Sequence, residues 1–275
     1  MKKERVEELN RICLDMRKDI LRMAKAAGAS GVHFGGTFSM IELMAVLYLE
    51  VMKWGEDSAK AENRDRFILS KGHGVPAVYA AMHQAGTVSD EELDTFKADA
   101  TRLYAHPSMD ANLGMEYSSG SLGQGLSLGV GAAIALRRKE NPARVFVLLG
   151  DGECDEGSVW EAAMAANQYH LNNLVAIVDR NKIQYDGDTE TVMGLNSLED
   201  KWKSFGFQVM TIDGHAVEQI YDALTTVSDK PLVIIAETIK GKGISFMEGD
   251  PGWHHKKMTG KQEKLAWEEL ENAGI

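Results

Sequence analysis

The sequence is poor in cysteine, in long apolar runs and in net positive charge, and each shortage excludes a class of protein. Two cysteines among 275 residues, Cys13 and Cys154, are too few for a disulfide framework and favour a reducing compartment. No apolar run reaches membrane-spanning length, and the charged N-terminus lacks the apolar core of a signal peptide. The net charge of −11 argues against nucleic acid or an anionic membrane as a partner. We therefore expect a cytoplasmic protein with neither partner.

The sequence does contain two apolar runs that are each followed by polar residues. Residues 145–149 precede the run Gly150-Asp151-Gly152, and residues 174–178 lie just before Asn181. A helical pattern covers residues 156–170 between them. Strand, helix and strand in this order form a crossover that lays the two strands parallel. Asp151 and Asn181 should then lie at one carboxyl edge of a sheet, where open α/β sheets bind ligands.

The residue types at this edge favour a metal ion with a diphosphate. The carboxylate of Asp151, the amide oxygen of Asn181 and a nearby main-chain carbonyl suit Mg²⁺, which prefers oxygen ligands. Gly150 and Gly152 let a bulky anion approach the backbone. A tight turn after a buried strand would also explain the three residues 150–152. The correctly spaced Asn181 favours the binding site over that alternative.

The rest of the chain predicts one doubly wound α/β domain over residues 1–275, with a mostly parallel sheet flanked by helices. Helices are expected over residues 4–27, 39–52, 121–138, 197–205 and 217–227, and a further helix follows residue 74 and ends at residue 84. Strands are expected over residues 67–69, 207–212 and 231–236. Capping boxes are expected at Ser89 with Glu92 and at Thr259 with Gln262, the second opening a terminal helix that reaches residue 272.

Four histidines lie next to glycine or proline in segments that read as loops. They are His33, His73, His106 and His254. A single histidine is more often a surface or core residue than a catalytic one. A neutral imidazole, however, both donates and accepts hydrogen bonds and titrates near neutrality, so it suits the hydroxyls and proton transfers of sugar chemistry. No HxH or HxxxH spacing supports a zinc site.

The segments 150–157 and 179–184 together resemble the thiamine-diphosphate motif, which begins at GDG and closes on an asparagine about thirty residues later. The sequence of these segments is more similar to that of transketolases than to that of the E1 subunits of 2-oxo-acid dehydrogenases. The resemblance implies thiamine diphosphate as cofactor. It also implies Mg²⁺, or Ca²⁺ or Mn²⁺ in its place, held by Asp151, by the side chain of Asn181 and by the carbonyl of Ile183.

The resemblance to transketolases continues in order over the chain, at residues 33–39, 70–73, 106, 120–125 and 240–254. The roles that it implies are sugar contacts for His33, His73, His106 and His254, cofactor contacts for His73, Gly120, Leu122, Gly150 and Gly152, and a subunit-interface position for Glu156.

Three residues depart from the family pattern. Val32 stands where glycine is usual, and a β-branched residue does not easily take positive φ, so we expect this loop to differ. Ser121 replaces a common proline. His255 follows His254 where glycine is common, so either histidine could face the site. The alignment favours His254.

The resemblance also implies a missing half. Transketolases carry the glutamate that activates the cofactor on a second α/β domain, and full-length members are more than twice as long. The chain thus resembles the N-terminal subunit of a split transketolase, which moves a two-carbon ketol unit between sugar phosphates. The partner would carry the glutamate, in a heterotetramer with two copies of each chain. The alternatives are a ketol transferase for an unusual sugar, an enzyme like 1-deoxyxylulose-phosphate synthase, an E1 α subunit, or a non-catalytic cofactor-binding subunit.

Overall fold

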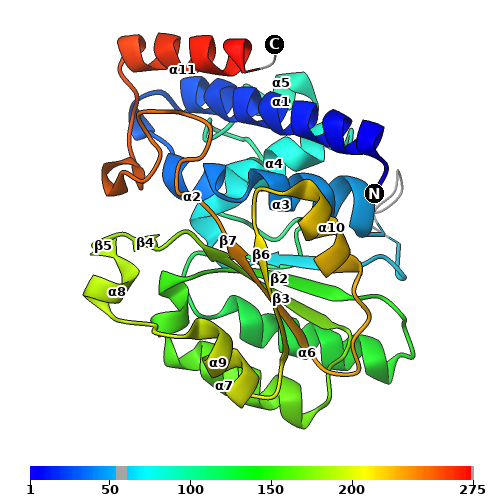
Figure 1. Ribbon diagram of the computed structural model, residues 1–275. Helices are drawn as coiled ribbons and strands as arrows, with labels where there is room; N and C mark the ends of the chain where they lie inside the picture. The colour runs from blue at the N-terminus through cyan, green and yellow to red at the C-terminus, as the bar shows by residue number, and fades with distance from the viewer. Residues whose placement is uncertain (54–60, 274–275) are drawn as a thin grey trace.

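Five strands form one parallel sheet with helices on both of its faces (Figure 1). The computed structural model of the protein describes residues 1–53 and 61–273. In spatial order the strands are β1 (Arg66–Leu69), β2 (Val145–Gly150), β3 (Leu174–Arg180), β7 (Leu232–Glu237) and β6 (Gln208–Asp213). Every neighbouring pair in this sheet is parallel, so the predicted α/β fold class is confirmed.

The central strands end at a common level. Gly150 at the end of β2 is in register with Asp179, and Arg180 at the end of β3 is in register with Glu237 of β7. The residues that follow these strands therefore share one carboxyl edge, as the sequence predicts for Asp151.

Side chains of the buried strands alternate between two cores. In β2, Val145, Val147 and Leu149 belong to one core, whereas Phe146 and Leu148 belong to the other. Successive side chains of a strand point to opposite faces of the sheet, so a strand covered on both faces needs an uninterrupted apolar run. That requirement explains why residues 145–149 carry no polar side chain.

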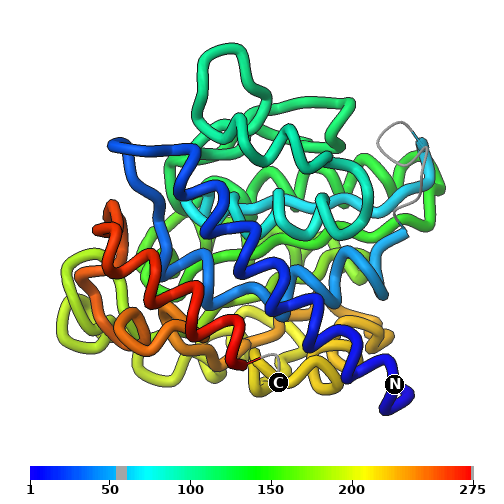
Figure 2. Tube along the Cα trace, turned by 90° about the horizontal axis from the view of Figure 1, so that it is seen from above, coloured from blue at the N-terminus to red at the C-terminus, as the bar shows by residue number. Residues whose placement is uncertain are grey.

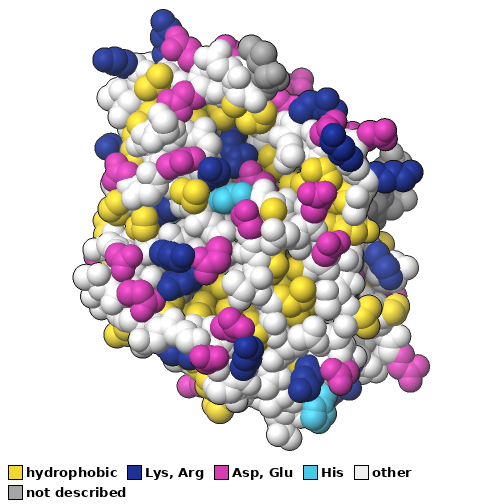
Figure 3. Space-filling model, in the orientation of Figure 1, with side chains coloured by type: hydrophobic (Ala, Val, Ile, Leu, Met, Phe, Trp, Pro, Cys, Tyr) yellow, Lys and Arg dark blue, Asp and Glu magenta, His cyan; other side chains and the backbone are white. Residues whose placement is uncertain are grey.

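Two layers of helices cover the sheet, and the layers correspond to the two cores. One face is covered by α6 (Gly125–Arg138), α7 (Gly157–Gln168) and α9 (Leu198–Ser204). The other is covered by α3 (Ile41–Val46), α4 (Val75–Gln84) and α10 (Val217–Thr225), and α1 (Lys3–Ala27) packs on the outer side of α3 and α4. The last helix, α11 (Gly260–Asn272), lies beside α1 on the outside of the second layer (Figure 2). On the face in Figure 3, acidic and basic side chains are interspersed with separate hydrophobic patches.

Short elements connect these layers. They are the helices α2 (Phe34–Phe38), α5 (Asp90–Leu93) and α8 (Thr189–Val192), the hairpin strands β4 (Ile183–Gln184) and β5 (Gly187–Asp188), the 3₁₀ turns η1 (Gly28–Ser30), η4 (Gly72–Gly74), η5 (Gly152–Asp155) and η6 (Pro251–Trp253), and the π-helical turn η2 (Leu47–Val51). Among the residues described, no helix combines the length and the apolarity needed to cross a membrane.

Both predicted capping boxes are confirmed, at the starts of α5 and α11. Two helix boundaries were predicted wrongly. The helix expected from residue 121 begins at Gly125, because Gly123 takes a φ of 81° and donates its N–H to Glu153. The helix expected over residues 39–52 is two elements, α3 and η2, because the N–H of Met52 bonds five residues back, to Leu47.

Two glycines of α6 allow a matched test of helix–sheet packing. A Cβ at Gly129 would lie 2.4 Å from Cγ2 of Val147, whereas a Cβ at Gly131 would meet nothing within 4 Å. We expect Gly129→Ala to lower the free energy of unfolding by about 1–3 kcal/mol through overpacking. Gly131→Ala should raise it by about 0.5–1 kcal/mol, because alanine favours the helix. Urea unfolding of the two variants measures both changes, and equal effects would contradict the packing described.

Candidate functional site

A cavity of about 330 Å³ opens at the carboxyl edge of the sheet. Among its lining residues are these from the sequence prediction: His73, Leu122, Gly150, Asp151, Gly152, Glu156, Asn181, Ile183 and His254. His33, His106 and Gly120 do not line the cavity. His33 and His106 adjoin it through the histidine rings, and a Cβ at Gly120 would lie 3.6 Å from the ring of His106.

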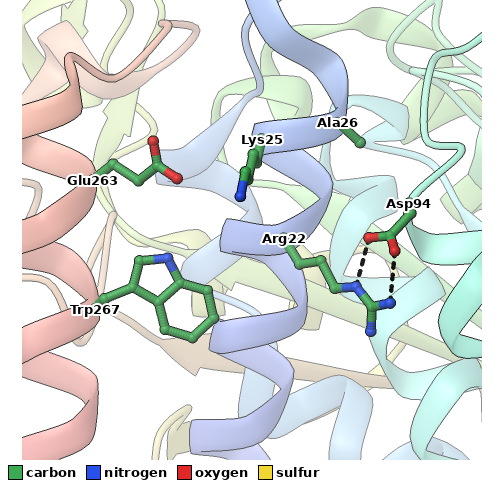
Figure 4. Close-up of a pocket in the computed structure, with 6 residues that line it drawn as sticks. All are labelled: Arg22, Lys25, Ala26, Asp94, Glu263 and Trp267. Carbon is green, nitrogen blue, oxygen red and sulfur yellow. Dashed lines mark hydrogen bonds and ion pairs between the residues drawn. The ribbon is translucent and has the colours of Figure 1, made fainter.

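A second cavity, of about 530 Å³, lies between α1 and α11, near the end of α5 (Figure 4). Arg22 from α1 meets the carboxylate of Asp94 there with two hydrogen bonds, of 2.6 and 2.7 Å, while Trp267 of α11 faces them from the other side. None of the predicted site residues lines this cavity. The candidate site is therefore the cavity at the sheet edge.

The three predicted metal ligands lie together on the cavity wall. Asp151 is 2% exposed, and its two carboxylate oxygens accept the N–H groups of Gly152, at 2.8 Å, and Lys182, at 2.5 Å. Burial, followed by the charge of Asp179, raises the pKa of Asp151. Among the described residues no group of three or more His, Cys, Asp or Glu side chains could hold a metal. The predicted donor set instead combines one carboxylate, one amide and one carbonyl.

Lys240 bears on whether an anionic cofactor fits here. Its Nζ donates to the carbonyl of Ile183 at 2.8 Å and lies 3.3 Å from Nδ1 of His254. Burial, followed by the charge of Lys71, lowers the pKa of Lys240 to about 8, so the group is mostly charged at neutral pH. A buried ammonium suits an anion, and oxygen donors suit a hard cation. The carbonyl of Ile183 would exchange its bond from Lys240 for the metal, which frees the ammonium for the diphosphate. The residues present therefore fit a metal-bound diphosphate.

A buried ion pair that the sequence analysis did not identify supports the cavity. Asp179 is fully buried and accepts hydrogen bonds from the ammonium of Lys71, from Ser39 at 2.6 Å, from Thr238 and from the amide of Asn181 at 3.2 Å. Burial alone would raise the pKa of Asp179, but Lys71 and these hydrogen bonds lower it. The bond to Asn181 orients a predicted metal ligand, whose Oδ1 accepts the N–H of residue 183 at 3.1 Å.

Glu153 fixes the loop that precedes α6. It is 2% exposed, and its carboxylate accepts the N–H groups of Gly123 at 2.8 Å and Gly150 at 3.0 Å as well as the hydroxyl of Ser70. Burial is the largest cause of its raised pKa. Through these bonds the loop that carries Leu122 is attached to the ends of β1 and β2. Ser121 and Glu156 are exposed beside this loop.

A buried network of charged side chains binds the main chain on both sides of Lys240. Glu42 accepts from Arg17 at 2.7 Å and lies 2.9 Å from Nδ1 of His215. Arg17 also donates to the carbonyl of Lys242 at 3.0 Å, and Nε2 of His215 meets the N–H of Ile239 at 2.9 Å. The sequence offered no signal for this network, because its members lie up to 225 positions apart.

The structure brings the four predicted histidines into one cluster. The ring centroid of His33 lies 5.5 Å from that of His73, 5.6 Å from that of His106 and 5.5 Å from that of His254. His73 and His254 are 5.1 Å apart. Glycine makes this approach feasible, because a Cβ at Gly36 would lie 2.8 Å from Nε2 of His73.

The loop at Val32 is held by main-chain pairing. Val32 forms an antiparallel bridge with Lys256, through hydrogen bonds of 3.0 and 3.1 Å. Gly31 supplies the positive φ, of 62°, and a Cβ there would lie 2.8 Å from the carbonyl oxygen of Lys256. His254 lines the cavity and His255 does not. His255 nevertheless joins the cluster, with its ring 4.4 Å from that of His33.

The lowered pKa values of the four predicted histidines favour neutral imidazoles at pH 7. Burial, followed by the charges of His255, His254, His106 and Lys97, lowers the pKa of His33 to about 3. Burial and then Lys240 lower the pKa of His254 to about 4. The pKa values of His73 and His106 are also lowered, with burial the largest cause. Neutral imidazoles can both donate and accept hydrogen bonds, which suits contact with a polyhydroxylated ligand.

Comparison with known proteins agrees with this geometry. Residues 13–269 match the family described as "Transketolase, thiamine diphosphate binding domain". An apulose-4-phosphate transketolase subunit of Phocaeicola vulgatus is 41% identical, with 92% of this chain and 90% of that protein covered. The 6-deoxy-6-sulfo-D-fructose transketolase subunit SqwG of a Clostridium species is 43% identical, with 90% of this chain and 91% of that protein covered. The solved transketolase of Campylobacter jejuni superposes with a TM-score of 0.87 at 28% identity; 98% of this chain spans 43% of that one.

The buried histidines should make stability depend on pH. The unfolded chain takes up protons on its histidines near pH 6.5, whereas folded His33 and His254 stay neutral until about pH 3 and 4. The free energy of unfolding should therefore fall as the pH is lowered from 7 to 5. His33→Asn should reduce this fall by at most about 1.4 kcal/mol per pH unit. Urea unfolding at several pH values measures it, with His170→Asn, an exposed site, as control. An unchanged pH dependence in His33→Asn would contradict the account.

Proposed function

The chain belongs to the transketolase family, and we propose that it is the subunit of a two-chain transketolase that binds thiamine diphosphate and Mg²⁺. The enzyme would transfer a two-carbon ketol unit from a ketose phosphate to an aldose phosphate. The observation that carries this proposal is the meeting of oxygen donors, a buried lysine and a histidine cluster at one cavity. That combination serves a metal-bound diphosphate on one side and a sugar on the other.

Each group in the cavity has a proposed task. Asp151, the amide oxygen of Asn181 and the carbonyl of Ile183 would hold Mg²⁺, or Ca²⁺ or Mn²⁺ in its place. Lys240 would neutralise diphosphate charge beside Gly152. When bound, the cofactor supplies a nucleophilic carbon and an electron sink. Its middle would lie near Gly120 and Leu122.

The histidines would bind the sugar and exchange protons with it. His33, His73, His106 and His254 are neutral and close-packed, so their ring nitrogens can accept protons from sugar hydroxyls and donate hydrogen bonds to carbonyl oxygens. Donors fixed before the reaction stabilise developing charge without having to reorganise.

A second chain is part of the proposal. It would supply the carboxylic acid that activates the cofactor, in a heterotetramer of two copies of each chain. Two relatives are named as subunits, and this chain spans 43% of a solved transketolase chain. Exposed apolar residues near the cavity offer a docking surface: Leu122, Tyr185, Val192 and Met193 are 38%, 71%, 41% and 59% exposed. Glu156 would lie at this interface, and the two free cysteines favour the cytoplasm.

A specialised sugar is the second candidate. The relatives at 41% and 43% identity are named for apulose 4-phosphate and 6-deoxy-6-sulfo-D-fructose. A ketol transferase for such a sugar would use the same cavity and cofactor. Initial rates with xylulose 5-phosphate and with 6-deoxy-6-sulfofructose as donors separate the two candidates. An enzyme like 1-deoxyxylulose-phosphate synthase or an E1 α subunit is less well supported, because the family match is to transketolase.

Asp151→Ala tests the cofactor site. Removing this carboxylate would leave the metal and the diphosphate charge poorly compensated, so Mg²⁺-dependent binding of thiamine diphosphate should be lost. The measurement is calorimetric titration of the cofactor into the assembled enzyme, with Asp229→Ala, an exposed carboxylate elsewhere, as matched control. Cofactor affinity unchanged by Asp151→Ala would end the proposal for the metal site.

A further inference from the structure

His215, just after the end of β6, joins a buried carboxylate to the main chain next to Lys240. Its Nδ1 lies 2.9 Å from the carboxylate of Glu42, and its Nε2 lies 2.9 Å from the main-chain nitrogen of Ile239. A main-chain N–H can only donate, so Nε2 is the acceptor, and the ring proton on Nδ1 is donated to Glu42. One imidazole thus ties the residue before Lys240 to α3, the helix that carries Glu42.

Arg17 of α1 binds the same carboxylate and the main chain on the other side of Lys240. Its Nη2 donates to Glu42 at 2.7 Å, and its Nε donates to the carbonyl of Lys242 at 3.0 Å. A Cβ at Gly243 would lie 2.6 Å from Nε of Arg17, so glycine leaves room for this bond. Arg17 and Glu42 are 4% and 7% exposed, and hydrogen bonds away from water are electrostatically stronger. The main chain is therefore fixed one residue before Lys240 and two residues after it.

The side chain of Lys240 passes closely over Gly35 on its way into the cavity. A Cβ at Gly35 would lie 2.8 Å from Cγ and 2.9 Å from Cε of the lysine. The carbonyl of Gly35 also accepts the N–H of Gly241 at 3.0 Å, which holds the two segments together. Lys240 is 2% exposed, and its ammonium reaches the carbonyl of Ile183 at 2.8 Å. Because the side chain is confined in this way, the place of the ammonium depends on where the main chain at residue 240 lies.

We propose that the carboxylate of Glu42, with His215 and Arg17 bound to it, positions the lysine that binds the diphosphate and so determines the affinity for the cofactor. The inference rests on the proposed function, which assigns the diphosphate to Lys240. Among the described residues that line the cavity, none belongs to this set of three, so the three act through the main chain beside the lysine. When the ammonium leaves the carbonyl of Ile183 for the diphosphate, the fixed main chain confines the change to the side chain. A charge-assisted hydrogen bond is strong when its geometry is prepared in this way.

His215→Phe and Lys240→Met form a double-mutant cycle that tests this dependence in the assembled enzyme. Calorimetric titration gives the Kd of thiamine diphosphate at saturating Mg²⁺. Each single variant should raise this Kd about tenfold, the usual effect of losing one charge-assisted hydrogen bond. The double variant should bind less than about twofold more weakly than Lys240→Met, because no ammonium is left to position. Losses that multiply to about a hundredfold, or no loss in His215→Phe, would overturn the inference.

His215→Gln and His83→Phe are the matched controls. Glutamine keeps an oxygen that can accept the N–H of Ile239, so it should restore most of the affinity that His215→Phe loses. His83 lies 3.0 Å from the carboxylate of Asp19, a similar bond between α4 and α1, and His83→Phe should change the Kd less than about twofold. Equal losses in His83→Phe and His215→Phe, or no recovery in His215→Gln, would contradict positioning. If His215→Phe does not fold, Arg17→Gln replaces it in the cycle with the same expected outcome.

Inorganic pyrophosphate separates this inference from the proposed function. Calorimetric titration of pyrophosphate with Mg²⁺ into the full chain measures binding of a diphosphate without the rest of the cofactor and without turnover. His215→Phe should weaken this binding severalfold when Lys240 is present and leave it unchanged in Lys240→Met. That pattern in a protein without ketol transfer would leave the inference standing. Pyrophosphate binding that His215→Phe does not change, or no binding of pyrophosphate at all, would overturn it even if the assembled enzyme transfers ketol units.

Discussion

The ammonium of Lys71, 1% exposed, lies against the fully buried carboxylate of Asp179, and the geometry of the cavity depends on this pair. Asp179 is the residue of β3 in register with Gly150, and it also binds Ser39, Thr238 and Asn181. One carboxylate thus joins the ends of strands to the segment that follows α2. Removing one partner of a buried pair typically costs about 3–5 kcal/mol, because the other charge stays buried without compensation.

The Lys71–Asp179 pair also determines where the histidines of the site lie. Lys71 also donates to the carbonyl of Gly36 at 2.7 Å, which brings α2 against the turn that carries His73. The glycine is required there, because a Cβ would collide with that imidazole. The histidines are therefore gathered by backbone contacts between loops from distant parts of the chain. Burial is the largest cause of their lowered pKa values, and neutral imidazoles can both donate and accept hydrogen bonds.

The sequence was sufficient where the signal is local. The apolar runs before Asp151 and Asn181, and the capping boxes of Ser89 and Thr259, predicted elements that the structure contains. The sequence was insufficient where a contact with a residue far away in the chain determines the local structure. Gly125 begins α6 because Glu153 holds the preceding loop. The pairs of Lys71 with Asp179 and of Arg17 with Glu42 join residues that no periodicity connects. Loop histidines could be identified as candidates, but their contacts, above all that of His255 with His33, depend on the bridge at Val32.

We propose that this chain supplies the diphosphate and histidine half of a ketol transferase whose other half is a separate chain. The most direct measurement is transfer between xylulose 5-phosphate and ribose 5-phosphate, with saturating thiamine diphosphate and Mg²⁺, by this chain alone and after mixing with a pyrimidine-binding partner chain. Light scattering of the same samples gives the assembly state. The account predicts no turnover by the chain alone, and turnover by a complex with two copies of each chain. Robust turnover by this polypeptide without a second chain would contradict it.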